Sequence, residues 1–132
     1  MATAVRILAI EDEPEWTELL GRALARAGLD AHIDRVMSEE ELRSALERQR
    51  WAVILSDNRM PRFSAKEALA IVRARDRAVR FVVVSGYLTD AQRTELEAGG
   101  ASEFVEKGDL RRVVSAVRTA LAARRPDDPV GD

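Results

Sequence analysis

Short apolar segments alternate along the chain with longer segments whose apolar residues fall on one helical face. Residues 52–56 and 81–84 contain uninterrupted apolar runs, which are typical of strands buried on both faces of a sheet. Residues 5–10 form another apolar run, interrupted by Arg6, and a shorter strand is expected near residues 102–105. The mixed polarity of residues 31–36 favours an edge strand. The pattern therefore predicts five strands.

The first helix is predicted to begin at Pro14, because proline is favoured at the first helical position. It is expected to end at Gly28, where a left-handed cap is needed. Its apolar residues have the spacing of one helical face. They are Trp16, Leu19, Leu20, Ala23, Leu24 and Ala27. This stripe is predicted to pack on the core, so Trp16 is interpreted as a core residue.

Three later helices open with a hydroxyl residue that is followed three positions on by Glu or Gln, a pattern typical of capping boxes. The pairs are Ser38 with Glu41, Ser64 with Glu67, and Thr89 with Gln92. The last helix is predicted to start after Asp109, another favourable N-cap residue. Gly99 and Gly100 are expected to close the fourth helix.

Strands that alternate with helices predict an α/β domain with a parallel sheet, and right-handed crossovers place helices on both faces. Five such units suggest the flavodoxin-like (βα)5 fold with strand order 2-1-3-4-5. In that order the loops after strands one and three diverge and form a crevice. We predict one domain over residues 1–124. Residues 125–132, which include two prolines, are interpreted as a flexible tail or the stub of a linker.

The bulk composition narrows the class of protein. The chain has 132 residues, enough for one compact domain, and its net charge of −2 gives no general electrostatic argument for binding nucleic acid. It has no cysteine and one histidine, which excludes disulfides, thiolate metal sites and multi-histidine zinc sites. Neither a signal-peptide pattern nor an apolar run of membrane-spanning length is present. We therefore expect a cytoplasmic protein without a membrane partner.

Ionisable side chains follow the predicted strands at points where an apolar core would not tolerate them unpaired. Glu11 and Asp12 follow the first strand, Asp57 follows the third and Lys107 follows the fifth. The hydroxyl of Ser85 follows the fourth. A fold that brings these ends together makes one pocket with three carboxylates and one ammonium group. Such a pocket is poorly explained by stability and suits a divalent cation with a phosphoryl group.

In these motifs the chain strongly resembles the receiver domain of two-component response regulators. The matching motifs extend over about residues 5–124. They are Glu11-Asp12, Asp57-Asn58-Arg59-Met60-Pro61, Ser85-Gly86, and Lys107 after Phe104-Val105-Glu106. Each motif alone is weak, but all four in order at strand ends are highly specific. The family has the strand order given above, so that prediction rests partly on the resemblance.

The resemblance implies that Asp57 accepts a phosphoryl group with the help of Mg²⁺, because a carboxylate alone is a weak nucleophile. The oxygen ligands that the resemblance implies for the ion are Glu11 (directly or through water), Asp12, Asp57 and the backbone carbonyl of Arg59. Lys107 and the Ser85 hydroxyl would contact the phosphoryl oxygens and offset the charge that develops there.

The resemblance also implies a conformational switch, for which we assign Phe104 and Tyr87. Phosphorylation would draw Ser85 toward the phosphate and let Phe104 turn inward. The surface that changes, roughly residues 89–121, is the predicted partner face. The partners implied are a sensor histidine kinase or phosphotransfer protein, a downstream protein or output domain, and a second copy in a homodimer, with no direct nucleic-acid contact.

Several positions depart from the commonest family pattern. Glu11 stands where Asp is usual, and Phe104 stands where Tyr is often found. Gly108 replaces the usual proline, so a trans Lys107–Gly108 bond is expected, since a non-proline cis bond costs about 3 kcal/mol. The loop there is expected to be more mobile. Arg59 and Tyr87 are bulky; we expect them to overhang the pocket and slow the loss of phosphate.

Three functions fit the residues to different degrees. The first is a phosphorylatable receiver, which is no enzyme apart from its own phosphorylation and dephosphorylation. The second is a receiver-like binding module that works without phosphorylation, although its acceptor and metal acids are intact. The third is a magnesium-dependent, phosphatase-like hydrolase, which would want a second acid where Arg59 stands. The sequence leaves open whether the domain is free-standing or part of a longer regulator.

Overall fold

The computed structural model describes residues 4–123, and the predicted tail at residues 125–132 lies outside this range. Five strands and five helices alternate in it. They are β1 (Val5–Ile10), α1 (Pro14–Arg26), β2 (Ala31–Val36), α2 (Glu39–Arg48), β3 (Val53–Asp57), α3 (Ala65–Arg75), β4 (Arg80–Ser85), α4 (Asp90–Ala98), β5 (Glu103–Glu106) and α5 (Leu110–Ala122). None of these helices has the length and apolar character that crossing a bilayer requires.

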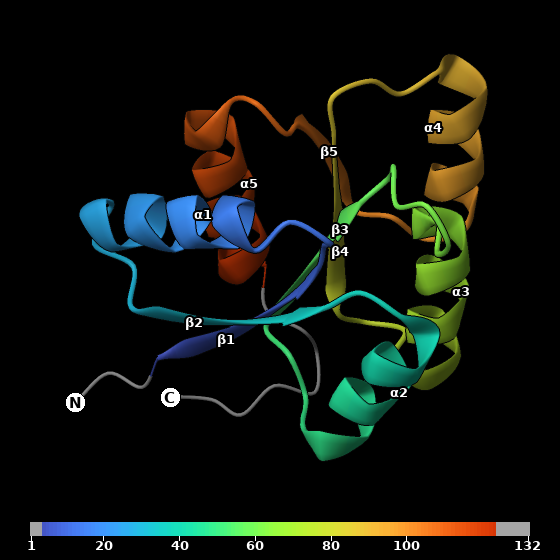
Figure 1. Ribbon diagram of the computed structural model, residues 1–132, viewed down its shortest axis with the longest axis horizontal. Coiled ribbons are helices and arrows are strands. Elements are labelled where there is room, and N and C mark those ends of the chain that lie inside the picture. The colour runs from blue at the N-terminus through green and yellow to red at the C-terminus, as the bar shows by residue number, and fades with distance from the viewer. Residues whose placement is uncertain (1–3, 124–132) are drawn as a thin grey trace.

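All neighbouring strands are parallel, and the sheet has the order β2-β1-β3-β4-β5. The predicted flavodoxin-like topology is therefore confirmed, with β2 at an edge. Figure 1 shows the sheet between two layers of helices, α1 and α5 on one face and α2, α3 and α4 on the other. The central strands β1, β3 and β4 are covered on both sides, which explains their apolar runs.

The core consists of two hydrophobic clusters, one on each face of the sheet. Leu20 and Leu24 of α1 pack with Val113 and Val117 of α5 on one face, in what we call the α1–α5 cluster. On the other face, residues of α2, α3 and α4 surround Phe81, which is fully buried, in what we call the α2–α4 core cluster. The alternation of side chains along each strand thus feeds both clusters and fixes the strand register.

The first helix begins at Pro14 and is followed by Gly28 with a φ of 84°, as the sequence predicts. The predicted apolar stripe holds at Leu20 and Leu24, which are buried. It is wrong at Leu19, which is 50% exposed. The α1 face that meets the sheet and α5 is narrower than the apolar stripe, so one leucine at its margin faces solvent.

The predicted caps are present at every later helix, with one correction. The boxes of Ser64 with Glu67 and Thr89 with Gln92 are complete, and Asp109 accepts from the amide of Arg112. The Ser38 hydroxyl accepts from the Glu41 amide, but the Glu41 carboxylate accepts from the amide of Met37 instead of Ser38. The second half of that box is therefore wrong by one residue.

Candidate functional site

The parallel register brings four strand ends to one edge of the sheet. Ile10 is opposite Ser56, so Glu11 and Asp57 follow at the same level of neighbouring strands. Asp57 itself is the last residue of β3. On the next pair, Ser85 is opposite Glu106, and Lys107 follows directly. The residues singled out from the sequence therefore lie together at the carboxyl ends of β1, β3, β4 and β5, where the strand order predicts a crevice. Figure 1 shows these strands side by side.

Four carboxylates meet at these strand ends, one more than the sequence predicts. Glu11, Asp12, Glu13 and Asp57 each offer an oxygen, and these atoms lie within 4.8 Å of one another. Glu11 and Asp57 are buried, at 1% and 5% exposure, whereas Asp12 and Glu13 are exposed. Carboxylate oxygens are the ligands that hard divalent cations prefer. We call these four residues the acid cluster.

Lys107 supplies the positive charge next to the acid cluster. Its Nζ donates to Glu11 Oε2 at 2.9 Å, to Glu13 Oε1 at 2.7 Å and to Asp57 Oδ2 at 3.1 Å. Burial alone would lower the pKa of this ammonium group, but the three carboxylates outweigh burial and raise its pKa above the usual range. Lys107 is therefore charged, and all three of its donors are engaged by carboxylates.

Glu11 is the acid of the site whose pKa is raised by burial. Burial raises its pKa from 4.5 to about 7, although hydrogen bonds from Lys107 and from the Glu13 amide act in the opposite direction. Its Oε2 accepts from both of those groups. Its Oε1 is buried and accepts no hydrogen bond from the described residues. A buried carboxylate oxygen that accepts no hydrogen bond is free to bind a cation.

Asp57 is held by one backbone contact and one side-chain contact. Its Oδ1 accepts from the backbone amide of Arg59 at 3.0 Å, and its Oδ2 accepts from Lys107. The Arg59 side chain is exposed, as the overhang hypothesis requires. Arg59 contacts Asp57 through its backbone amide, and the role of its carbonyl as a metal ligand stays a prediction.

The Ser85 hydroxyl contacts its own loop in this structure. Its Oγ donates to the carbonyl of Tyr87 at 2.7 Å and accepts from the Tyr87 amide at 3.2 Å. Ser85 is 7% exposed, whereas Tyr87 is 67% exposed. The hydroxyl therefore lies at the crevice edge with a hydrogen bond that it would have to exchange in order to reach a phosphoryl oxygen.

Phe104 lies beside the crevice in contact with α4. Its ring packs against the α2–α4 core cluster, and the guanidinium carbon of Arg93 lies 4.5 Å from the ring centroid. Phe104 and Tyr87 both line a hollow of about 370 Å³ that also includes residues of α4 and α5. The two residues assigned to the switch are thus on the walls of one hollow on the predicted partner face.

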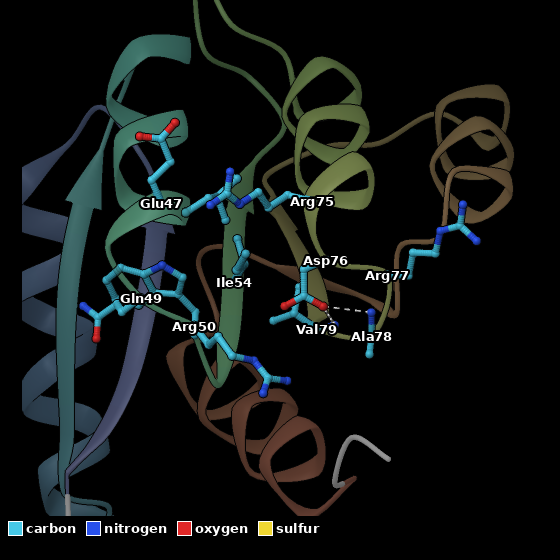
Figure 2. A pocket seen from close by; sticks show the side chains of 11 residues that line it. Glu47, Gln49, Arg50, Ile54, Arg75, Asp76, Arg77, Ala78 and Val79 are labelled. Atoms are coloured by element: carbon cyan, nitrogen blue, oxygen red, sulfur yellow. Dashed lines mark hydrogen bonds between the residues drawn. The ribbon is translucent and has the colours of Figure 1, made fainter. Parts of the chain in front are cut away.

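A second hollow lies at the opposite, amino-terminal end of β3 and β4. It has a volume of about 490 Å³ and is lined by residues of the α2–β3 and α3–β4 connections. Figure 2 shows Arg50, Arg75 and Arg77 around it, with Asp76 accepting from the amides of Ala78 and Val79. The acid cluster and Lys107 lie at the other edge of the sheet, so this second hollow is not part of the candidate site.

Comparison with known proteins agrees with this geometry. The family model for the response regulator receiver domain matches residues 7–118. The chain belongs to the response regulator receiver domain family. It is a receiver domain of the two-component type, and its fold and motifs confirm the resemblance noted in the sequence.

Relatives of this receiver domain include longer regulators. The hydrogenase transcriptional regulatory protein HoxA of Cupriavidus necator is 36% identical over 123 residues, which cover 89% of this chain and 24% of HoxA. This chain spans about a quarter of the length of the curated relatives that it matches.

Solved structures share the receiver fold. A two-component response regulator of the LuxR family from Aurantimonas sp. SI85-9A1 has a TM-score of 0.80 and 25% identity, covering 95% of this chain and 92% of that chain. The receiver domain of the sensor histidine kinase PA1611 from Pseudomonas aeruginosa has a TM-score of 0.76 and 20% identity, covering 92% and 100%. That crystal structure contains a magnesium ion in its active site cleft.

Two residues at the site of this receiver domain were not selected from the sequence. Glu13 joins the acid cluster and forms the shortest ion pair with Lys107. Its position two residues after Glu11 could have indicated it, because the backbone there is still extended. Trp16 was interpreted as a core residue, and it does pack on the α1–α5 cluster. Its indole also contacts Lys107, which no spacing in the sequence indicates.

Proposed function

We propose that this receiver domain accepts a phosphoryl group on Asp57 from a histidine kinase or a phosphotransfer protein. The observation that carries the proposal is the pair of donors on the buried Asp57 carboxylate, the Lys107 ammonium at 3.1 Å and the Arg59 amide at 3.0 Å. These two donors fix the orientation of the Asp57 carboxylate, which is the nucleophile in the proposed phosphoryl transfer.

In the proposed reaction an Asp57 carboxylate oxygen bonds to phosphorus while the bond between phosphorus and the donor's imidazole nitrogen breaks. The donor imidazole carries a proton on its other ring nitrogen, so it keeps the bonding electron pair and departs as neutral imidazole. Asp57 becomes an acyl phosphate. Lys107 transfers its hydrogen bonds from the carboxylates to phosphoryl oxygens and offsets their charge. Catalysis by this chain is limited to gaining and losing its own phosphoryl group, and we place this exchange in the cytoplasm.

The donor set fits Mg²⁺, because the candidate ligands are oxygens and the buried Glu11 Oε1 has no other partner among the described residues. The residues that would hold the ion are Glu11, Asp12, Asp57 and the carbonyl of Arg59. A bound Mg²⁺ would screen the repulsion between the Asp57 carboxylate and the incoming phosphoryl group. The magnesium ion in the PA1611 receiver domain supports the same metal here.

The signal would leave through the surface formed by α4, β5 and α5. Phosphorylation would favour the arrangement in which the Ser85 hydroxyl leaves the Tyr87 carbonyl for a phosphoryl oxygen. Phe104 would then turn inward and leave Arg93, which changes the hollow that it lines. A downstream protein, an output domain or a second copy of the chain would bind the changed surface. The longer curated relatives support an output domain as one such partner.

Two exposed side chains would set how long the phosphoryl group persists. Arg59 and Tyr87 lie two residues beyond Asp57 and Ser85, and both side chains are exposed. We expect them to restrict the water that hydrolyses the acyl phosphate. Replacing both by Ala should speed the loss of phosphate about threefold to tenfold, the effect of roughly one lost contact. An unchanged decay rate would remove this part of the proposal.

The experiment for the main proposal is incubation with acetyl phosphate, with Mg²⁺ or with EDTA, followed by intact mass. The wild type should gain one phosphoryl group only with Mg²⁺, and Asp57→Asn should gain none. A chain that never gains the group under any condition would be the phosphorylation-independent binding module. A chain that releases inorganic phosphate over many turnovers from unrelated phosphate esters would be the hydrolase. Either result would replace the receiver function proposed for Asp57.

A further inference from the structure

Lys107 lies at the first central position of a tight turn between β5 and α5. The Asp109 amide donates to the Glu106 carbonyl at 3.2 Å and closes the turn, and the Lys107 amide donates to the Ser85 carbonyl at 3.0 Å. The second central position is Gly108, which is exposed. The peptide bond between the two residues is trans, as predicted.

Gly108 gives this turn little restraint of its own. No heavy atom lies within 4 Å of the place where a Cβ would be, and its φ lies outside the left-handed region. Neither space nor backbone conformation therefore demands glycine here. Glycine at such a position gives the backbone more conformational freedom than any other residue would. The position of Lys107 then depends on contacts from elsewhere in the fold.

Trp16, in the first turn of α1, provides two such contacts. Its Nε1 donates to the Lys107 carbonyl at 3.2 Å, and the Lys107 Nζ lies 5.4 Å from the centroid of its ring. One side chain thus holds the backbone of Lys107 and also faces its ammonium group. The hydrogen bond restrains the turn, and the ring offers the ammonium group an attractive surface when it leaves a carboxylate.

We propose that Trp16 is a positioning residue for Lys107, and that it supplies the restraint that Gly108 does not. The proposal rests on the proposed function, in which Lys107 binds the phosphoryl group. In the part of the chain that the structure describes, Trp16 contacts Lys107 and makes no hydrogen bond to Asp57 or to the other acids, so it acts through Lys107. Loss of the indole donor should loosen the turn and misplace the ammonium group during transfer.

The chain offers a matched control in its other tryptophan. Trp51 Nε1 also donates to a backbone carbonyl, that of Ala45 at 3.0 Å. Trp51 is 2% exposed and belongs to the α2–α4 core cluster, on the face of the sheet opposite to Trp16. Trp51→Phe therefore removes the same kind of hydrogen bond without touching Lys107, and it reports the effect of lost stability alone.

The test compares Trp16→Phe with Trp51→Phe in two measurements. The first is hydrogen exchange at the Asp109 amide, which closes the turn, in protein without metal or phosphate. The second is the initial rate of phosphorylation by acetyl phosphate with saturating Mg²⁺. Trp16→Phe should speed exchange and slow phosphorylation, each about threefold to tenfold, the range expected for one hydrogen bond. Trp51→Phe should leave the phosphorylation rate unchanged, and it should speed exchange at the Asp109 amide by no more than its loss of global stability explains.

A double variant tests the restraint itself. Alanine at position 108 meets no neighbour and has less freedom than glycine. Trp16→Phe with Gly108→Ala should therefore recover part of both losses. Unchanged exchange and an unchanged rate in Trp16→Phe, or equal effects of Trp16→Phe and Trp51→Phe, overturn the proposal. If the wild type takes up no phosphate, the proposed function has failed, and the exchange measurement alone decides whether Trp16 restrains the turn.

Discussion

The two sides of the crevice are built differently. The acid cluster on the β1–β3 side includes two buried carboxylates, and Glu11 and Asp57 follow strands whose register fixes their spacing. On the β4–β5 side, which we call the turn side, Ser85, Phe104 and Lys107 are held by contacts with Tyr87, Arg93 and Trp16. The strand register positions the backbone of both sides, but on the turn side the Ser85 hydroxyl, the Phe104 ring and the Lys107 turn are also held by contacts that can be exchanged. In the proposed function, the buried acids would receive the phosphoryl group, and the contacts that can be exchanged would report it.

The largest effect is expected when the residue that joins the two sides of the crevice, Lys107, is replaced. Lys107→Met leaves the buried Glu11 and Asp57 carboxylates without their common cation. Because breaking a buried pair leaves an uncompensated charge, the free energy of unfolding without metal should fall by about 3 kcal/mol. Urea unfolding at about pH 8 measures this, since Glu11 is then ionised in the wild type. Without Lys107, which lowers the Glu11 pKa, burial makes the ionised form of Glu11 more costly in the variant.

Lys66→Met is the control for that variant. Lys66 pairs with Glu95 at 3.2 Å, and its side chain is 69% exposed. Its loss should change the free energy of unfolding by less than about 1 kcal/mol, because exposed pairs contribute little. If the two lysine variants lose equal stability, Lys107 does not stabilise the acid cluster in the way described.

A smaller effect, of opposite sign, is expected at Glu11. Its folded pKa is raised to about 7, so its contribution is fully present below pH 4.5 and is lost as the pH rises through about 7. Glu11→Gln removes this loss, and without metal it should raise the free energy of unfolding by about 2 kcal/mol at about pH 8. At about pH 4 the gain should disappear, because both side chains are then neutral.

The same substitution should weaken Mg²⁺ binding, because an amide oxygen replaces a charged ligand. Glu95→Gln, at an exposed position on α4, should alter neither the stability profile nor metal binding. A Glu11→Gln variant that is less stable than the wild type at both pH values would contradict the assignment of Glu11 as a strained, buried acid.

The smallest effect is expected on the turn side, at the contact between Arg93 and Phe104. Arg93→Ala removes a cation over an aromatic face, which contributes about 0.5–1 kcal/mol at an exposed site. The Phe104 ring should then show faster exchange between rotamers in NMR relaxation dispersion. Arg43→Ala removes an exposed ion pair on α2 and should leave Phe104 unaffected. Equal ring dynamics in the wild type and in Arg93→Ala would show that Arg93 does not restrain the switch.

The sequence predicted the backbone of the site better than its side chains. Apolar runs and capping residues located the elements, and the crossover rule then brought Glu11, Asp57 and Lys107 to one edge. The partner of a polar side chain depends on atoms a few ångströms away, which spacing along the chain does not encode. This is why the direction of the Ser85 hydroxyl and the contact between Trp16 and Lys107 were not predicted.

The same limit explains the smaller errors. Ser38 has the sequence of a capping box, yet the Glu41 carboxylate binds the neighbouring Met37 amide, because both amides are within its reach. An acid directly before a helix can be explained by the helix dipole, so the sequence does not single out Glu13 as a site residue. In the folded chain, the carboxylate of Glu13 lies with the other three acids and pairs with Lys107, which is 94 residues away in the chain.

The central claim, that the acid cluster receives the phosphoryl group at Asp57, is tested most directly by locating that group. After incubation with acetyl phosphate and Mg²⁺, borohydride reduction converts an aspartyl phosphate to homoserine, and peptide mass mapping finds the position. We predict homoserine at position 57 alone, present with Mg²⁺ and absent with EDTA. Homoserine at position 12, or none at position 57 in protein that has gained a phosphoryl group, would contradict the account.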